Sequence, residues 1–343
     1  MKSLLALLLA ALSVPSLAQT TAPAFGLKEA KALGAADTAQ FYAANTSPIW
    51  DALSPEMKKN IKDPAGLQNI QHKVTAMFGK EERVLHESVL LTPGNIYAYT
   101  RIIEFEKSEQ SFLFQWSFSA DGKVIEGFGI HLEPNPAPTK FADYKDKTPL
   151  TLPLAGAWTV YQGGDSVGEN YHAGTIDERF AYDLALLKDG AIYSGDGTKS
   201  EDFFAFGQPV HAPGAGKVVS LADQYADNAP GKAAAEGDPR QGNSIVIDHG
   251  NGEFSMLAHL KSGSIKVKAG DTVKAGDTIA QVGQSGDAPM PYLDYHLQNT
   301  PVWSKGKGLP IQFQHLLVNG KPTPTPPIRG DVIETKTAAI PAK

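Results

Sequence analysis

Apolar residues recur at two different spacings along the chain, and the change of spacing divides it into regions. In residues 27–79 they recur every three or four positions, which predicts helices. In residues 97–132 they alternate with polar residues, and a turn sequence at 120–123 interrupts the alternation, which predicts a hairpin followed by a third strand. Helices followed by antiparallel strands predict a small α+β module over residues 19–133.

The second half of the chain has a different pattern. Residues 154–320 consist of short apolar runs between Gly-rich turns, such as the run 244–248 and the turn at 249–252, which predicts a mainly β domain of antiparallel strands. Two proline-rich segments flank this region. We expect residues 134–153 to form a semi-rigid linker and residues 321–343 to form a tail that is poorly ordered at its end.

The first residues have the features of a secretory signal. Lys2 provides a basic start, residues 4–12 are an uninterrupted Leu/Ala run, and small residues at 16 and 18 precede Gln19. This pattern predicts a cleavable signal peptide over residues 1–18 and a periplasmic or secreted protein. The run is far shorter than the ~20 residues that span a membrane, and no later run is longer, so we expect no membrane span.

Composition narrows the classes of function. A length of 343 residues suggests two domains, and 42% hydrophobic with 20% charged residues is typical of globular proteins. The formal net charge of −6 gives no general attraction to nucleic acid. Because the chain has no cysteine, disulfides, a thiol nucleophile and Cys-ligated zinc are excluded.

Five segments in the second half share motifs with one family, and they follow one another in the family's order: 206–216, 242–252, 258–260, 263–271 and 282–286. They resemble the lysostaphin-type zinc metallopeptidases, metallopeptidase family 23, which cut peptide cross-links in bacterial cell walls. The resemblance implies an antiparallel β floor with loops that wall a groove, lined by Asn243 and Ser285. The module over residues 19–133 is weakly similar to cystatin-like domains of the nuclear-transport-factor type.

The family's catalytic residues are only partly present. The resemblance implies a zinc site built from His-x-x-x-Asp and His-x-His, with a further assisting His in Ala-His-Leu. Here Asp183 keeps the first motif's Asp, but Arg179 replaces its His. Tyr292 replaces the catalytic His of the second motif, and Asp294 replaces the ligand His. His259 keeps the assisting position.

Three interpretations are open. In the first interpretation the site is metal-free, and the guanidinium of Arg179 bridges Asp183 and Asp294. Alternatively, zinc is held by an altered set in which His172 or His296 joins the two carboxylates. In the third interpretation the motifs are misaligned. The joint Arg and Asp replacements favour the first, so we expect no cofactor, with zinc as the alternative.

The functional hypothesis follows from this ambiguity. We expect an exported, peptidoglycan-directed member of the family that binds cell-wall peptide or a partner hydrolase without cutting. The rival hypothesis is an active zinc endopeptidase that cleaves peptidoglycan cross-links with an altered ligand set. Neither hypothesis involves nucleic acid.

Overall fold

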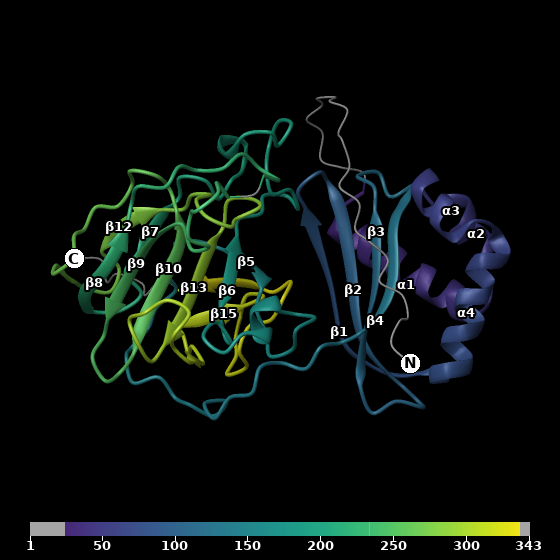
Figure 1. The fold of residues 1–343 in the computed structure, drawn as a ribbon, viewed down its shortest axis with the longest axis horizontal. Coiled ribbons are helices and arrows are strands. Elements are labelled where there is room, and N and C mark those ends of the chain that lie inside the picture. Colours follow the sequence, from purple (N-terminus) through teal and green to yellow (C-terminus); the bar gives the residue numbers. More distant parts are fainter. Residues whose placement is uncertain (1–24, 233, 337–343) are drawn as a thin grey trace. The chain divides into compact units, whose positions relative to one another are not determined.

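The computed structural model describes residues 25–232 and 234–336. The predicted signal peptide, residues 1–18, lies outside the described residues. The chain divides into two compact units, Met1–Pro134 and Asn135–Lys343, each with its own core (Figure 1). Among the described residues, no helix has both the length and the apolar content needed to cross a bilayer.

The N-terminal unit combines helices with one antiparallel sheet. Its helices are α1 (Leu27–Tyr42), α2 (Ser47–Ala52), α3 (Pro55–Ile61) and α4 (Pro64–Phe78). Its strands are β1 (Glu81–Thr92), β2 (Ile96–Phe105), β3 (Ser111–Phe118) and β4 (Ile125–Leu132), paired in that order. The alternating aromatic residues of β3 face α1, where Phe41 lies 5.6 Å from Phe114 between ring centroids. Strand β1 extends the sheet beyond the strands that the sequence predicts.

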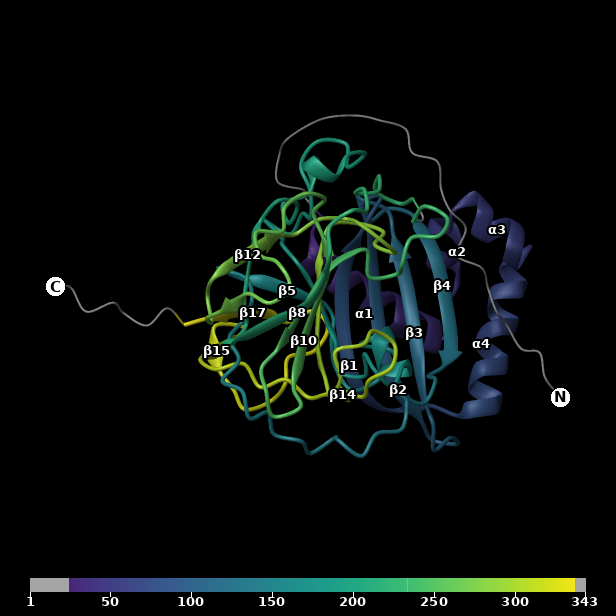
Figure 2. The ribbon, with the colours of Figure 1, turned by 60° about the vertical axis from the view of Figure 1, so that its left-hand side comes forward.

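The C-terminal unit is built on one large antiparallel sheet (Figures 1 and 2). The strands of this sheet are β5 (Trp158–Gln162), β6 (Tyr182–Ala185), β8 (Gly216–Ala222), β9 (Asn243–Asp248), β10 (Phe254–Leu260), β11 (Thr272–Val273), β13 (Leu293–Gln298), β14 (Gly308–Leu309), β15 (Leu316–Val318), β16 (Lys321–Pro322) and β17 (Val332–Thr335). The order is β11-β8-β9-β10-β13-β6-β5-β17-β15-β16, and β14 pairs with β13. Strands β7 (Pro209–His211) and β12 (Thr278–Gln281) form a separate pair. The predicted fold class, mainly β after a small α+β module, is confirmed.

The described parts of both proline-rich segments differ from the predicted linker and tail, and the end of the tail, residues 337–343, lies outside the described residues. In the expected tail, β17 pairs with β5, and Ile333 is fully buried in the main core. In the expected linker, Leu150 and Leu152 are buried in the same core, and fully buried Glu253 accepts hydrogen bonds from the backbone at 147 and 148. The described parts of these segments therefore belong to the C-terminal unit, because each places apolar side chains in its core.

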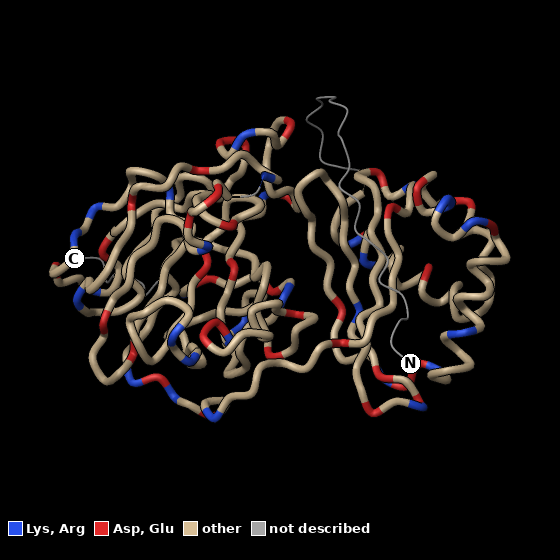
Figure 3. The backbone as a smooth tube through the Cα atoms, viewed as in Figure 1, with Lys and Arg blue, Asp and Glu red and all other residues tan. Residues whose placement is uncertain are grey.

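Charged residues are distributed without long runs of one sign. Figure 3 shows acidic and basic residues interspersed along the described chain. Charged groups are usually exposed, but two carboxylates lie at the centre of the large sheet of the C-terminal unit. Asp183 on β6 and Asp294 on β13 are both buried there.

Candidate metal centre

Two carboxylates face each other on neighbouring strands. Strands β6 and β13 pair antiparallel, with Asp183 directly opposite Asp294. Residues opposite each other in an antiparallel pair project from the same face of the sheet. The register therefore brings two carboxylates together in a buried place, which is costly unless a cation or hydrogen-bond donors compensate.

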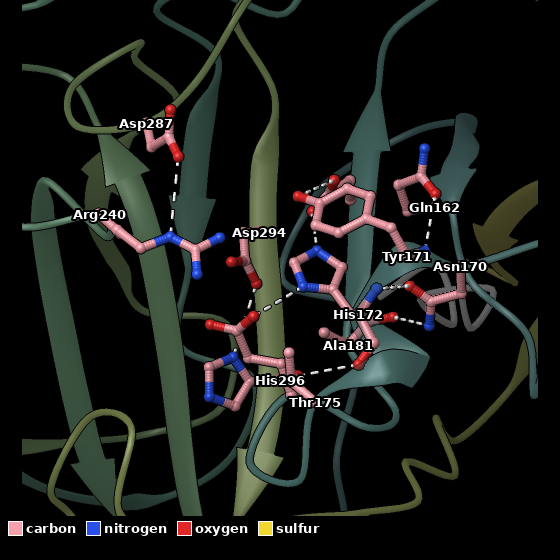
Figure 4. Close-up of polar contacts among 12 residues, drawn as sticks. Gln162, Asn170, Tyr171, His172, Thr175, Ala181, Arg240, Asp287, Asp294 and His296 are labelled. Carbon is pink, nitrogen blue, oxygen red and sulfur yellow. Dashed lines mark hydrogen bonds and ion pairs between the residues drawn. The ribbon is translucent and has the colours of Figure 1, made fainter. Parts of the chain in front are cut away.

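His172 brings an imidazole to these carboxylates. It belongs to the short 3₁₀ helix η1 (Tyr171–Gly174) and is labelled in Figure 4. Its Nε2 lies 2.9 Å from Oδ1 of Asp183. Its Nδ1 lies 2.9 Å from Oε2 of Glu178. The turn is held by buried Asn170, which accepts the amide N–H of His172 and donates its Nδ2 to the carbonyl of Ala181. The position of His172 is thus fixed by the sheet and by its own loop.

These three residues form a group that can hold a metal ion. One ligand atom from each of His172, Asp183 and Asp294 lies within 4.8 Å of the others, and all three residues are buried. One nitrogen and two carboxylate oxygens are zinc donors, and Oδ1 of buried Asp294 has no hydrogen-bond partner. Glu178 holds the outer nitrogen of His172, as carboxylates do behind metal-ligating histidines. The residues therefore fit zinc.

Electrostatics also favour a cation here. Burial disfavours the imidazolium form of His172, but the surrounding carboxylates, Asp183 first, hold its pKa well above its usual value. Burial raises the pKa of Asp183 despite the neighbouring His172. For Asp294, burial works in the same direction, but the neighbouring histidines outweigh it and keep the pKa of this carboxyl below its usual range. The carboxylates of this centre therefore favour a positive charge beside them.

Arg179 does not provide that positive charge, which corrects the predicted guanidinium bridge between Asp183 and Asp294. Its Nε donates to the carbonyl of Ala137 at 3.2 Å, and its Nη1 lies 3.7 Å from Oδ1 of Asp165. The guanidinium also stacks on Phe180, with 5.0 Å from its carbon to the ring centroid. The predicted bridge to the two carboxylates is absent among the contacts of the described residues, because the side chain turns away toward these partners.

His259 reaches the centre through an irregular strand. Ala258 is paired with Asp294, so regular alternation would turn the next side chain to the other face of the sheet. Instead, β10 has a register shift between Leu257 and Leu260, and His259 has a φ of 59°. This bulge directs the ring toward the centre, where Nε2 lies 4.0 Å from Oδ2 of Asp294.

Two tyrosines complete the surroundings. The hydroxyl of Tyr171 donates to Oδ2 of Asp183 at 3.2 Å, while 45% of this residue is exposed, so it marks the side open to solvent. Tyr292 is buried, and its ring packs edge-on against that of His259, with centroids 5.1 Å apart. A phenol thus stands beside the imidazole at the position where the family resemblance implies a second histidine.

Asn243 and Ser285 do not line an open groove. Both are fully buried, and the hydroxyl of Ser285 accepts the amide N–H of Asn243 and donates to the carbonyl of Leu260. The Ser285 carbonyl accepts from Nδ1 of His259 at 2.9 Å. These residues support His259, because their polar atoms are used by the backbone and by that ring.

Sequence reasoning did not identify Glu178 or Tyr171. Each of them directly precedes a residue that the sequence did single out: Glu178 precedes Arg179, and Tyr171 precedes His172. Only the fold shows that both side chains contact the centre.

Comparison with known proteins agrees with the motif order. The family described as "Peptidase family M23" matches residues 197–308, a segment that contains His259, Tyr292 and Asp294. Residues 197–308 of the C-terminal unit form a lysostaphin-type M23 domain. The match begins after His172 and Asp183, so these two residues lie outside the matched segment.

Two curated relatives and one solved structure are similar to parts of this chain. "Cell division protein DipM" of Caulobacter vibrioides is 27% identical over 164 residues, 47% of this chain and 25% of that protein. "Peptidoglycan DD-endopeptidase ShyB" of Vibrio cholerae is 32% identical over 107 residues, 31% of this chain and 21% of that protein. The lysostaphin catalytic domain of Staphylococcus simulans is 22% identical, with 45% of this chain and 86% of that chain covered at a TM-score of 0.25. The matches to both curated relatives thus span a quarter or less of those proteins.

Proposed function

We propose that this chain is an exported, cell-wall-directed M23 protein that binds zinc through His172, Asp183 and Asp294 and hydrolyses peptide bonds of peptidoglycan. The observation that carries the proposal is the convergence of these three donor atoms within 4.8 Å. Export rests on the predicted signal peptide, residues 1–18. The cell-wall substrate is supported by the similarity to a peptidoglycan DD-endopeptidase of Vibrio cholerae and by the match to the M23 family.

The chain's own residues supply the groups that such a reaction needs. Zinc, when bound, supplies a Lewis acid that activates water and polarises the amide carbonyl. Because a carbonyl only accepts, the contact of His259 Nδ1 with Ser285 places the ring proton on Nδ1 and leaves Nε2 free to take a proton. The hydroxyl of Tyr171 donates to Oδ2 of Asp183 from the exposed side and so helps to hold that carboxylate in place as a ligand.

Metal content tests the first part of the proposal. Protein purified without chelator should contain about one zinc per chain, since three ligands with one open position are typical of catalytic zinc sites. Asp294→Ala and His172→Ala should each abolish stoichiometric zinc. His72→Ala, at an exposed position of α4, should leave the zinc content unchanged. Wild-type protein that holds no zinc after incubation with excess zinc and gel filtration would contradict it.

Hydrolysis tests the second part. Zinc-loaded protein incubated with purified peptidoglycan should release shortened muropeptides that mass spectrometry detects, and Asp294→Ala should release none. Tyr292 at the family's assisting position favours a second candidate, a groove that binds cell-wall peptide without cutting it. Stoichiometric zinc and retention on peptidoglycan, with no cleavage products, would support this second candidate.

A further inference from the structure

His296 is a buried histidine whose ring has no hydrogen-bond partner among the described residues. It is 1% exposed, and neither Nδ1 nor Nε2 makes a hydrogen bond. Its cross-strand neighbour Met256 is apolar, and Trp303 packs on it edge-on with centroids 5.3 Å apart. A buried polar group without a partner costs roughly 1–3 kcal/mol, so its retention needs a reason.

A carboxylate of the metal centre lies close to this ring. Strand alternation places His296 on the same face as Asp294, and Nδ1 lies 3.6 Å from Oδ1 of that carboxylate (Figure 4). Oδ1 is itself buried without a hydrogen-bond partner. The other oxygen, Oδ2, is the one that lies 4.0 Å from Nε2 of His259. The two carboxylate oxygens therefore face two different histidines.

We propose that His296 is a positioning residue that donates its Nδ1–H to Oδ1 of Asp294 and orients this carboxylate as a metal ligand. The inference rests on the proposed zinc site. An imidazole ligand needs an acceptor behind it, as Glu178 is for His172. A carboxylate ligand needs a donor behind it, and His296 is placed to be that donor for Asp294.

Zinc affinity tests the inference without any activity assay. We expect His296→Leu, which removes the donor, to weaken zinc binding ten- to a hundredfold in chelator competition, the usual effect of losing a partner behind a ligand. His296→Asn keeps an N–H at the place of Nδ1 and should bind zinc more tightly than His296→Leu. In an Asp294→Ala background, His296→Leu should cause no further loss, because the effect acts through Asp294.

A metal-free measurement separates this inference from the proposed zinc site. In chelator-treated protein, the ring ¹⁵N spectrum of His296 should show the Nδ1–H form, and Asp294→Ala should change it. A ring protonated at Nε2 alone, or equal zinc affinity for His296→Leu and wild type, would overturn the inference. If wild type binds no zinc, the proposed function fails while the ring spectrum still decides the role of His296. The spectrum and His296→Asn also suffice if His296→Leu does not fold.

Discussion

The guanidinium of Arg179 is occupied by Ala137 and Phe180, so a substitution at this position alone should not build a metal ligand. We predict that Arg179→His leaves zinc affinity unchanged. Asp294→His should increase the preference for zinc over manganese about tenfold or more, because imidazole suits zinc while carboxylate suits manganese. Isothermal titration with both metals measures this preference.

The zinc affinities of the variants at positions 179 and 294 can contradict this prediction. If Arg179→His raises zinc affinity and Asp294→His does not, position 179 belongs to the centre and the observed direction of its side chain is wrong. Tyr225→Phe, a change outside the centre, serves as the matched control, since only the backbone of Tyr225 makes a described hydrogen bond.

At the residue scale, the sequence predicted which residues lie near the two carboxylates better than it predicted where their side chains point. Both His172 and His296, the histidines beside the two carboxylates, were among the alternatives for the altered ligand set. The direction of Arg179 could not be predicted, because it depends on partners in a distant segment, such as the carbonyl of Ala137. Buried Asn243 was misjudged because a motif position does not show whether a side chain faces a groove or the backbone.

At the element scale, the segment before β5 is held by a buried carboxylate. Glu253 accepts hydrogen bonds from the Tyr144 hydroxyl, from the amides of Lys147 and Thr148, and from the Thr148 hydroxyl. Burial opposes its charged form, but these donors outweigh it and lower the pKa of Glu253. We predict that Glu253→Gln destabilises the protein by roughly 1–3 kcal/mol at pH 7, since it sets an amide against donors.

The sign of the pH dependence follows from that lowered pKa. A native pKa below the unfolded value stabilises the fold above the unfolded pKa, about 4.3 for Glu, and this stabilisation is lost as the pH falls through the native pKa. The difference between wild type and Glu253→Gln in urea unfolding should therefore be largest near neutral pH and narrow below about pH 4. A difference that grows on acidification would contradict this account.

Strand β17 provides a second test at the same scale. Ile333 is fully buried where β17 joins β5, whereas its neighbour Val332 is 41% exposed. Ile333→Ala should cost roughly 2–5 kcal/mol of unfolding free energy, as expected when a core side chain is truncated. Val332→Ala should change it by less than about 0.5 kcal/mol. Equal effects in chemical denaturation would mean that β17 does not belong to the folded core.

The elements of regular alternation, β2 and β3, were predicted correctly, and two others were missed. Strand β1 begins with charged residues and has register shifts, so its period of two is hidden. Strand β17 was assigned to a tail because the prolines before it dominated the composition. In both cases tertiary pairing overrides the local pattern.

At the scale of the whole molecule, the limits of the C-terminal unit determine which fragments should fold. A fragment of residues 135–336 retains Leu150, Leu152 and β17, while a fragment of residues 154–320, the limits predicted from sequence, lacks them. We predict that the longer fragment unfolds cooperatively and that the shorter one melts at a markedly lower temperature or stays unfolded, because it loses buried apolar surface. Circular dichroism against temperature compares the two directly, and equal melting temperatures would contradict the assignment of both segments.

The bulge at His259 has a consequence for anyone who would transplant this centre. A designer who copied the side chains onto an ideal, evenly pleated sheet would find the assisting imidazole on the opposite face of the sheet, even if the sequence spacing were kept. The irregularity has to be copied with the residue, including its left-handed backbone at φ 59°, which most residues avoid. Sequence identity alone would not reveal the failure, since the transplanted motif would still read Ala-His-Leu.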